Sequence, residues 1–328
     1  MGSQRISVVI PNYNHAAFLH QRIDSVLQQT RPPYEIIILD DCSIDNSREI
    51  ISGYVASYPF IKFIPNTINS GSTFSQWNKG VDIAKGELVW IAESDDVAEP
   101  TFLEKLAACF EANDDVVLAY CQSDLINEAG EITGSANTFT EGLDATIFEK
   151  DFIMPGMKYI EQFLIHRNTI PNGSAVMFRK EFYLRSGAIP VEIKSMGDWL
   201  QWLRILCFGK IAFVAQPLNH FRRHPESVIA KALGKLEQDN FKDWYGYEVR
   251  CHFMSFLRRA KMSLSPLAKK SNDGYMAIDR GNLGLQHLGD GKFMQGWKLI
   301  IQASFYPVLQ SGFIKKALLG NNKKDNKR

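Results

Sequence analysis

The chain has 328 residues, 45% hydrophobic and 22% charged, which is the balance of a folded globular protein large enough for one main domain and an appendage. Its formal net charge of +1 provides no overall field that would favour nucleic acid. The five cysteines form no CxxC pair, which argues against a disulfide framework or a zinc site and fits a reducing cytosol. No run approaches the ~18 apolar residues of a spanning helix, and the first residues lack the apolar core of a signal peptide, so we expect a cytoplasmic protein.

Strands and helices are predicted to alternate through the first 122 residues. Short apolar runs rich in Val and Ile predict buried strands at 6–10, 35–39, 61–64, 88–92 and 116–121. Apolar residues on one helical face predict helices at about 15–29, 44–58, 74–84 and 103–110. Asn14 is the expected N-cap of the first helix, and Gly86 is expected to end the third. This order predicts an α/β fold whose mostly parallel sheet is covered by helices on both faces.

The rest of the chain is less regular. Residues 123–155 are polar and are expected to form a loop. Beyond them we expect a helix at 158–165, a strand at 174–178, a buried helix at 198–208 and strands at 211–214 and 218–221. From about residue 229 the pattern is helical and is expected to be broken at Gly234, Gly274, Gly281, Gly289 and Gly296. We therefore divide the chain into an α/β domain at 1–228 and a C-terminal helical region at 229–328, with a basic tail at 315–328.

Polar clusters follow three of the predicted strands: PNYN at 11–14, DDCS at 40–43 and ESDD at 93–96. Polar strand ends that converge on one edge of such a sheet are typical of a nucleotide site. Asp40 and Asp41 are placed to accept hydrogen bonds from a base or ribose. The alternative for Asp41 and Asp45 is capping of the second helix. No GxGxxG or Walker A sequence occurs, so a dinucleotide or P-loop site loses its main support.

The acids Glu93, Asp95 and Asp96 crowd one strand end. They repel one another unless a cation offsets their charge, and such oxygen-rich sites suit Mg²⁺ or Mn²⁺. On these residues alone, a polar loop leading into a helix near Pro100 is equally compatible.

Two later motifs also carry candidate functional groups. Asp198 stands beside Trp199 at the start of an apolar helix, where desolvation would raise its pKa and make it a better base; capping of that helix is the alternative. Arg204 could be its buried partner or bind phosphate. The sequence RRHPESV at 222–228 suits an anionic ligand, with His224 as a possible metal ligand, although a solvated basic turn would look similar.

Together these motifs resemble the inverting glycosyltransferases of family 2, which have the Rossmann-like GT-A fold. The matching pieces are ISVVIPNYNHAAFLHQRIDSVLQQT, YEIIILDDCSIDNS, NSGSTFSQWNKGVDIAKGELVWIAESDD, MGDWLQWLRI and HFRRHPESV, in the family's order. The resemblance implies sugar transfer from a nucleotide sugar, in a UDP-linked form, to a hydroxyl acceptor. It also implies Mg²⁺ or Mn²⁺, and a saccharide or lipid-linked saccharide acceptor used in surface polysaccharide or glycolipid synthesis.

The resemblance assigns roles position by position. Asp198 matches the catalytic base. Asp95 and Asp96, with His224, would hold the metal. The nucleotide-sugar contacts would be Pro11, Tyr13, Asp40, Asp41, Asn69, Gly71, Asn78, Asp95, Arg222 and Ser227. Two positions depart from the family pattern, because Glu93 replaces the first acid of DxD and Gly197 replaces the Glu that usually precedes the base.

Other functions remain open at this point. A nucleotidyltransferase that makes nucleotide sugars would usually carry a Gly- and Arg/Lys-rich phosphate loop where this chain has PNYN. A catalytically degenerate sugar-nucleotide-binding protein would be consistent with Gly197. The segment 297–319 mixes aromatic and aliphatic residues with lysines, which suggests either an interfacial helix at the inner face of the plasma membrane or a helix packed on the protein.

Overall fold

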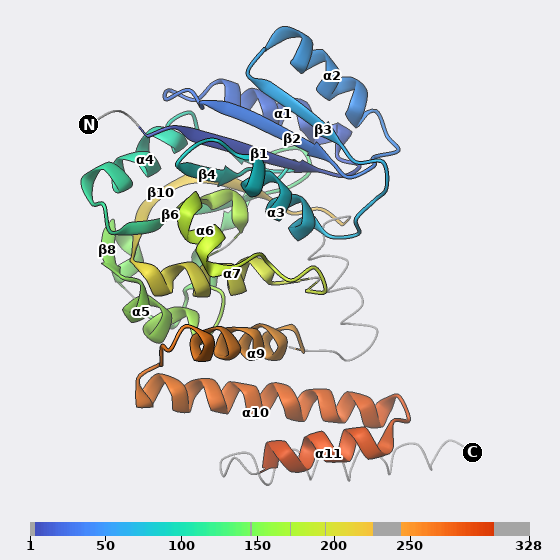
Figure 1. The fold of residues 1–328 in the computed structure, drawn as a ribbon, viewed down its shortest axis with the longest axis vertical. Helices are drawn as coiled ribbons and strands as arrows, with labels where there is room; N and C mark the ends of the chain where they lie inside the picture. Colours follow the sequence, from blue (N-terminus) through green and yellow to red (C-terminus); the bar gives the residue numbers. More distant parts are fainter. Residues whose placement is uncertain (1–3, 145, 171, 194, 226–243, 305–328) are drawn as a thin grey trace. The chain divides into compact units, whose positions relative to one another are not determined.

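The computed structural model describes residues 4–144, 146–170, 172–193, 195–225 and 244–304 (Figure 1). It divides into two compact units, Met1–His224 and Pro225–Arg328. The boundary that we predicted at residue 228, together with Ser227, Gly234 and the basic tail, lies outside the described residues.

A ten-stranded sheet forms the centre of the first unit, in the order β3-β2-β1-β4-β9-β6-β10-β5, with β7 beside β6 and β8 beside β10. The strands β1 to β4 and β10 to β6 pair in parallel, whereas β9 runs antiparallel between β4 and β6. This confirms the predicted mostly parallel sheet. The strands are β1 (Ile6–Asn12), β2 (Glu35–Asp40), β3 (Ile61–Pro65), β4 (Leu88–Ile91), β5 (Val97–Ala98), β6 (Val116–Ile126), β7 (Ile132–Ser135), β8 (Phe152–Pro155), β9 (Val176–Arg179) and β10 (Lys210–Arg222).

Helices cover both faces of this sheet. Successive residues of a strand point to opposite faces, so one strand packs against helices on both sides. Val8 packs with α1, α2 and α4, while its neighbour Val9 lies under α3, where a Cβ on Gly80 would come within 2.3 Å of it. Trp202 of α7 packs on Phe178 on that second face. The helices are α1 (Ala16–Leu27), α2 (Ser47–Ser57), α3 (Thr73–Ile83), α4 (Phe102–Ala112), α5 (Gly156–Tyr159), α6 (Lys180–Ser186) and α7 (Gly197–Ile205). Single-turn helices add Ala136–Phe139, Ile147–Glu149, the π-turn Ile160–Leu164, Gly173–Ala175 and Leu206–Phe208.

The first helix begins differently from the prediction. Asn14 is not its N-cap: it adopts a left-handed φ of 56°, and its Oδ1 accepts a hydrogen bond from Ile44 N. Asp45 instead accepts one from Ala16 N and another from Ser47 N, at the starts of α1 and α2. One carboxylate from the second loop therefore satisfies backbone donors of two helices, which no local pattern in the first loop could reveal.

Two further predictions were wrong, both because polar residues of a strand resemble loop residues. The supposed loop after residue 121 begins as more of β6, and the two strands predicted at 211–214 and 218–221 are one strand, β10, with register shifts beside Pro217. Buried polar pairs join these strands, for example Asn219 Nδ2 donating to Ser123 Oγ at 3.1 Å. Polar residues that satisfy one another across a sheet resemble loop residues when each is considered alone.

The second unit contains α9 (Trp244–Arg259), α10 (Pro266–Gly289) and α11 (Phe293–Ser304). Gly274 and Gly281 lie inside α10, and Gly296 lies inside α11, instead of ending helices, which corrects the prediction. Gly284 and Gly296 allow α10 and α11 to approach closely, since a Cβ on Gly284 would lie 2.9 Å from Gly296 O. Among the described residues, no helix has both the length and the apolar character to cross a bilayer.

Candidate active site

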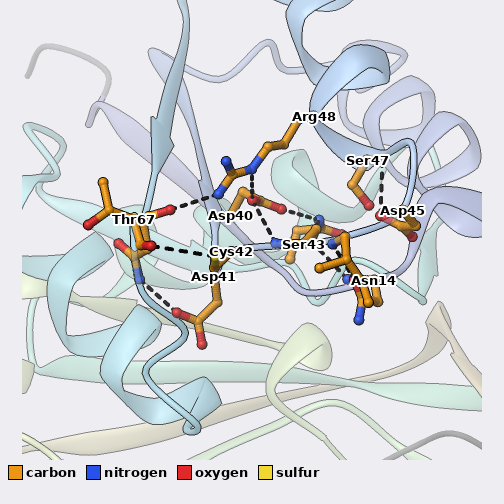
Figure 2. A network of polar contacts seen from close by, with 12 residues as sticks. Asn14, Asp40, Asp41, Cys42, Ser43, Asp45, Ser47, Arg48 and Thr67 are labelled. Carbon is orange, nitrogen blue, oxygen red and sulfur yellow. Dashed lines mark hydrogen bonds and ion pairs between the residues drawn. The ribbon is translucent and has the colours of Figure 1, made fainter.

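The ends of β1 and β2 are joined by a network of polar contacts (Figure 2). Asp40 is fully buried, and its carboxylate accepts hydrogen bonds from Arg48 Nε at 2.7 Å, Ser43 N at 3.1 Å and Asn12 Nδ2 at 3.0 Å. These contacts show Asp40 holding the two strand-end loops together. Its contact with the nucleotide stays a prediction.

Asp41 connects this network to the loop before α3. Its carboxylate accepts hydrogen bonds from Ser70 N and Oγ, from Asn66 Nδ2 and from Gln76 Nε2, at 2.7 to 2.9 Å. The same loop carries the exposed Asn69, whose Oδ1 accepts a hydrogen bond from Gly71 N in a tight turn where Gly71 has a φ of +66°. Two residues that we predicted in the donor site, Asn69 and Gly71, therefore lie on the loop to which a third, Asp41, is hydrogen-bonded.

The first strand contributes an aromatic surface to the same edge of the sheet. Pro11 is buried within β1, whereas the ring of Tyr13, two residues later, is 46% exposed. An exposed ring beside a polar strand end offers a planar base a surface for stacking. Asn78, in contrast, has a structural role: its side chain bonds Tyr183 OH and both backbone groups of Ile189, and its contact with a donor stays a prediction.

The acids after β4 have a buried cation behind them. Arg22 of α1 is fully buried, donates from Nε to Glu93 O at 2.8 Å and lies over the ring of Trp90. Burial lowers the pKa of Arg22 to about 10, against the opposing attraction of Asp96, Asp95 and Glu93. Arg22 therefore remains charged at neutral pH and offsets part of the acids' repulsion.

The three acids respond differently to their surroundings. Burial, reinforced by the charge of Asp95, raises the pKa of Glu93 to about 8 and that of Asp96 to about 7. Burial also opposes ionisation of Asp95, but the hydrogen bond from His224 and the attraction of His15 outweigh it, so the pKa of Asp95 is lowered. Asp95 is thus the acid of this set that is most readily ionised.

A possible metal site forms around Asp95. One ligand atom from each of His15, Asp95 and His224 lies within 4.8 Å of the others, and His224 Nε2 is 3.0 Å from Asp95 Oδ2. Adjacent ligands of an octahedral ion with bonds of ~2.1 Å lie about 3 Å apart, which is the separation of His224 Nε2 and Asp95 Oδ2. Asp96, which we predicted as a ligand, is outside this cluster, because its two oxygens accept from Arg222 N and Asn172 Nδ2. His15 is the third member of the cluster, and a metal contact of Asp96 stays a prediction.

Arg222 was predicted to bind the diphosphate, but the structure shows its guanidinium committed to the protein. It donates to Asp95 O, to the carbonyls of Asn127 and Glu128, and to Gln21 Oε1, and it is 1% exposed. Arg222 therefore fastens the end of β10 to the acid loop and places His224 beside Asp95. A direct phosphate contact stays a prediction.

Asp198 lies in the first turn of α7, partly open to solvent. Its Oδ2 accepts a hydrogen bond from Asn168 Nδ2 at 3.0 Å, and burial raises its pKa despite bonds from this amide and from the backbone of Trp199. Met196 occupies the N-cap position, so helix capping by Asp198 is not observed. Arg204 donates to Ala188 O. The base that we predicted therefore has the raised pKa expected of one.

The structure explains the glycine that precedes this base. A Cβ on Gly197 would lie 2.7 Å from Phe74 Cε2 and 2.8 Å from Ile189 Cγ2. The start of α7 is pressed against α3 and the 186–193 segment, so no side chain fits without movement. The Glu that the family resemblance leads one to expect at position 197 would therefore require Phe74, Ile189 or the start of α7 to shift.

Sequence reasoning missed four residues of this site: His15, Arg22, Asn168 and Asn172. Arg22 left a signal, since it stands between Leu19 and Ile23 on the apolar face of a predicted helix, where a charge must be buried. His15 follows the polar PNYN cluster directly. The two asparagines are separated from the acids they bond by thirty and seventy-six residues, and no local pattern marks them.

Comparisons with known proteins agree with this geometry. The family model "Glycosyl transferase family 2" matches residues 7–183. An uncharacterized glycosyltransferase of Nostoc sp., alr2836, is 27% identical over 76% of this chain and 74% of its own. TuaG of Bacillus subtilis, named as a glycosyltransferase of teichuronic acid biosynthesis, is 27% identical over 76% of this chain and 90% of its own.

Solved structures with the same fold include S. aureus TarS 1–349 in complex with UDP, which superimposes with a TM-score of 0.65 at 18% identity over 95% of this chain and 88% of that one. Its complex with UDP-GlcNAc gives a TM-score of 0.64 over 92% of this chain and 80% of that one. The fold is therefore GT-A, as the sequence predicted. The chain belongs to glycosyl transferase family 2 and is a glycosyltransferase.

Proposed function

We propose that this protein is an inverting, metal-dependent glycosyltransferase that moves a sugar from a UDP-linked donor to a hydroxyl acceptor. One observation carries this proposal: the site has two separate sets of carboxylates. The acids at 93–96 have the buried Arg22 behind them and His15 and His224 beside Asp95, whereas the groups that stabilise the Asp198 carboxylate are neutral donors. A leaving diphosphate needs the first environment and an attacking hydroxyl needs the second.

The donor end fits a nucleoside diphosphate. The loops around Asp41 and the exposed ring of Tyr13 would hold the nucleoside, next to the acid loop. The choice of UDP rests on TarS, whose structures contain UDP and UDP-GlcNAc.

The metal end fits a divalent cation held by His15, Asp95 and His224. Two nitrogen donors and one oxygen favour Mn²⁺ over Mg²⁺, which prefers oxygen. When bound, such a cation would neutralise charge that develops on the leaving diphosphate.

The acceptor end depends on Asp198. In a single displacement, the acceptor oxygen bonds to the anomeric carbon as the bond to the diphosphate oxygen breaks, and Asp198 takes the hydroxyl proton. Its raised pKa makes the carboxylate a stronger base than an ordinary Asp. Attack opposite the leaving group inverts the anomeric carbon and needs no covalent intermediate.

The proposed acceptor is a saccharide or lipid-linked saccharide of a surface polymer. This follows from TuaG, whose name places it in teichuronic acid biosynthesis.

A donor screen tests the proposal. Wild type and Asp198→Asn are incubated with a panel of nucleotide sugars, candidate acceptors and Mn²⁺ or Mg²⁺, and nucleoside diphosphate release is measured together with product stereochemistry. We expect release by the wild type alone, with inverted product, and its loss with a chelator. Full activity of Asp198→Asn would refute the assigned base, pyrophosphate release would indicate a nucleotidyltransferase, and donor binding without turnover on any acceptor would indicate a degenerate binding protein.

We also propose that the helical region contacts the inner face of the plasma membrane through α11. This helix buries Gly296, Ile300 and Ala303 but exposes Phe293, Met294 and Ile301 beside Lys292 and Lys298. An apolar stripe flanked by cations suits anionic lipid. The part of the predicted amphipathic segment beyond residue 304 lies outside the described residues.

Vesicle flotation tests this contact. Wild type should float with vesicles that contain anionic lipid, and a variant with Ser at positions 293, 294 and 301 should float less. Equal flotation would remove α11 from the proposal, and concentration-dependent self-association of the wild type alone would assign the stripe to a second copy of the chain.

A further inference from the structure

Two asparagines four residues apart, Asn168 and Asn172, each contact one of the two sets of carboxylates. At one end, Asn168 Nδ2 donates to Asp198 Oδ2 at 3.0 Å, while Asn168 Oδ1 accepts from Ile170 N at 3.2 Å in a local turn. The amide is therefore held by its own backbone while it holds the base. Its orientation is fixed independently of any ligand.

At the other end, Asn172 holds the acid loop. Its Nδ2 donates to Asp96 Oδ2 at 2.9 Å, and its Oδ1 accepts from Ala175 N at 3.0 Å and from Asn219 Nδ2 at 3.3 Å. Asp96 also accepts from the backbone of Arg222, which positions His224. Asn172 thus belongs to the same hydrogen-bonded group as Asp95 and His224, two of the proposed metal ligands.

Thr169 and Ile170, which follow Asn168, are anchored in the core. Thr169 Oγ1 lies 2.9 Å from Tyr159 OH, which lies 2.7 Å from Tyr120 OH, and all three residues are buried. Ile170 is fully buried. Side chains that are buried and hydrogen-bonded in this way have few alternative positions, so Asn168 stands on a rigid support, while Asn172 is held by its own bonds to Ala175 and Asn219.

We propose that Asn168 and Asn172 are positioning residues that fix the catalytic base relative to the donor-binding acids. The inference rests on the proposed function, in which Asp198 is the base. Four peptide steps limit the distance between the two Cα atoms to about 14 Å, so the segment restricts how far the two carboxylate sets can separate. Displacing reacting groups by about 1 Å can slow a reaction roughly 100-fold.

Asn168 also affects the ionisation of the base, because its amide donates to Asp198 Oδ2. The groups that act on the carboxylate besides burial are neutral donors, namely this amide and the backbone of Trp199 and of Asp198 itself. Loss of the amide should therefore both loosen the base and disfavour its ionised form.

Kinetics of Asn168→Ala and Asn168→Asp test the inference. For Asn168→Ala we expect kcat to fall by about 10- to 100-fold with little change in the KM for the donor, and the acid limb of the pH profile of kcat/KM to move to higher pH. Asn168→Asp keeps the acceptor for Ile170 N but places a like charge against Asp198, so its acid limb should move further. Asn172→Ala should instead weaken the apparent affinity for Mn²⁺ and leave the acid limb in place.

A matched control is available in Asn113, whose Oδ1 accepts from Asp115 N at 3.0 Å in the same type of turn, at the end of α4. Asn113→Ala should retain wild-type kinetics, and thermal unfolding shows whether each variant is folded. If Asn168→Ala keeps the wild-type kcat and pH profile while Asp198→Asn is inactive, the inference is wrong and the proposed function stands. If Asp198→Asn is itself active, the proposed function has failed.

Discussion

The acid loop at 93–96 and the segment that carries Asp198 place the same kind of group in two opposite environments. The acid loop has charged neighbours on several sides, with Arg22 behind it and His15 and His224 beside it. Asp198 is stabilised by neutral donors, an amide and backbone N–H groups. Both environments are desolvated, and desolvation alone would raise the pKa of every carboxyl group in them.

The difference shows how one residue type supplies two functions. At Asp95, the hydrogen bond from His224 and the attraction of His15 outweigh burial, so its pKa falls and it can hold a metal. At Asp198, burial outweighs the neutral donors, so its pKa rises and it can take a proton. Each of the following variants changes one side of this contrast.

Removing the base should have the largest effect. Asp198→Asn should lower kcat about 10²- to 10⁴-fold, the usual contribution of a general base, as measured by nucleoside diphosphate release. The folded-state pKa of Asp198 lies above its unfolded value, so ionisation of Asp198 destabilises the fold progressively as the pH rises from the unfolded pKa through the folded one. At a pH above both of these pKa values, Asp198→Asn should therefore unfold at a higher temperature than wild type. At a pH below both, the two proteins should unfold at the same temperature. A lower melting temperature at high pH would contradict this.

Removing the buried cation behind the acids should have the next largest effect. Arg22→Met keeps much of the side-chain volume but leaves the acids at 93–96 without that charge, and should lower the free energy of unfolding by about 3 to 5 kcal/mol. Mn²⁺ should restore part of the loss and bind more tightly than to wild type, because it replaces the missing charge. Calorimetry with and without Mn²⁺ measures both effects, and Arg5→Met is a control because Arg5 pairs with Glu87 where both side chains are half-exposed. Equal stability of Arg22→Met and wild type would show that the acids need no such partner.

Enlarging the residue before the base should have an intermediate effect. Gly197→Ala introduces a Cβ within 2.7 to 2.9 Å of Phe74 and Ile189, and should cost about 1 to 3 kcal/mol of stability. The start of α7 must shift, so kcat should fall while Mn²⁺ affinity is retained. Gly53→Ala, in open space on α2, is the matched control and should be neutral or stabilising. Unchanged kcat in Gly197→Ala would show that the base tolerates movement of its helix.

The smallest expected effect lies on the donor side, in the loop of Figure 2. Cys42 has a φ of 66° and a weak contact of 3.6 Å from Sγ to Thr67 O. Cys42→Gly relieves the left-handed strain and should raise the free energy of unfolding by about 1 kcal/mol with unchanged kcat, as chemical denaturation and the transferase assay would show. Cys109→Gly, within helix α4, should be destabilising by a similar amount. Destabilisation by Cys42→Gly would mean that the thiol contact outweighs the strain.

The amino-acid sequence alone determined the parallel half of the fold, because the strands around Val8, Ile37 and Trp90 are apolar on both faces and only a sheet covered on two sides accommodates them. It also marked the acids at 93–96, Asp198 and His224, since charged groups after apolar runs are visible locally. It misread β10 and the end of β6, where polar residues are satisfied by partners in distant segments.

Only the tertiary structure decided which side chains contact these acids and histidines. It brought His15 beside Asp95 and His224, committed Arg222 to backbone carbonyls, and brought Asn168 and Asn172 to the two carboxylate sets. The physical reason is that the composition of a strand end fixes which charges are present, whereas the hydrogen bonds that orient them come from residues far away in the chain. Burial then sets each pKa through those neighbours, and the sequence alone does not specify them.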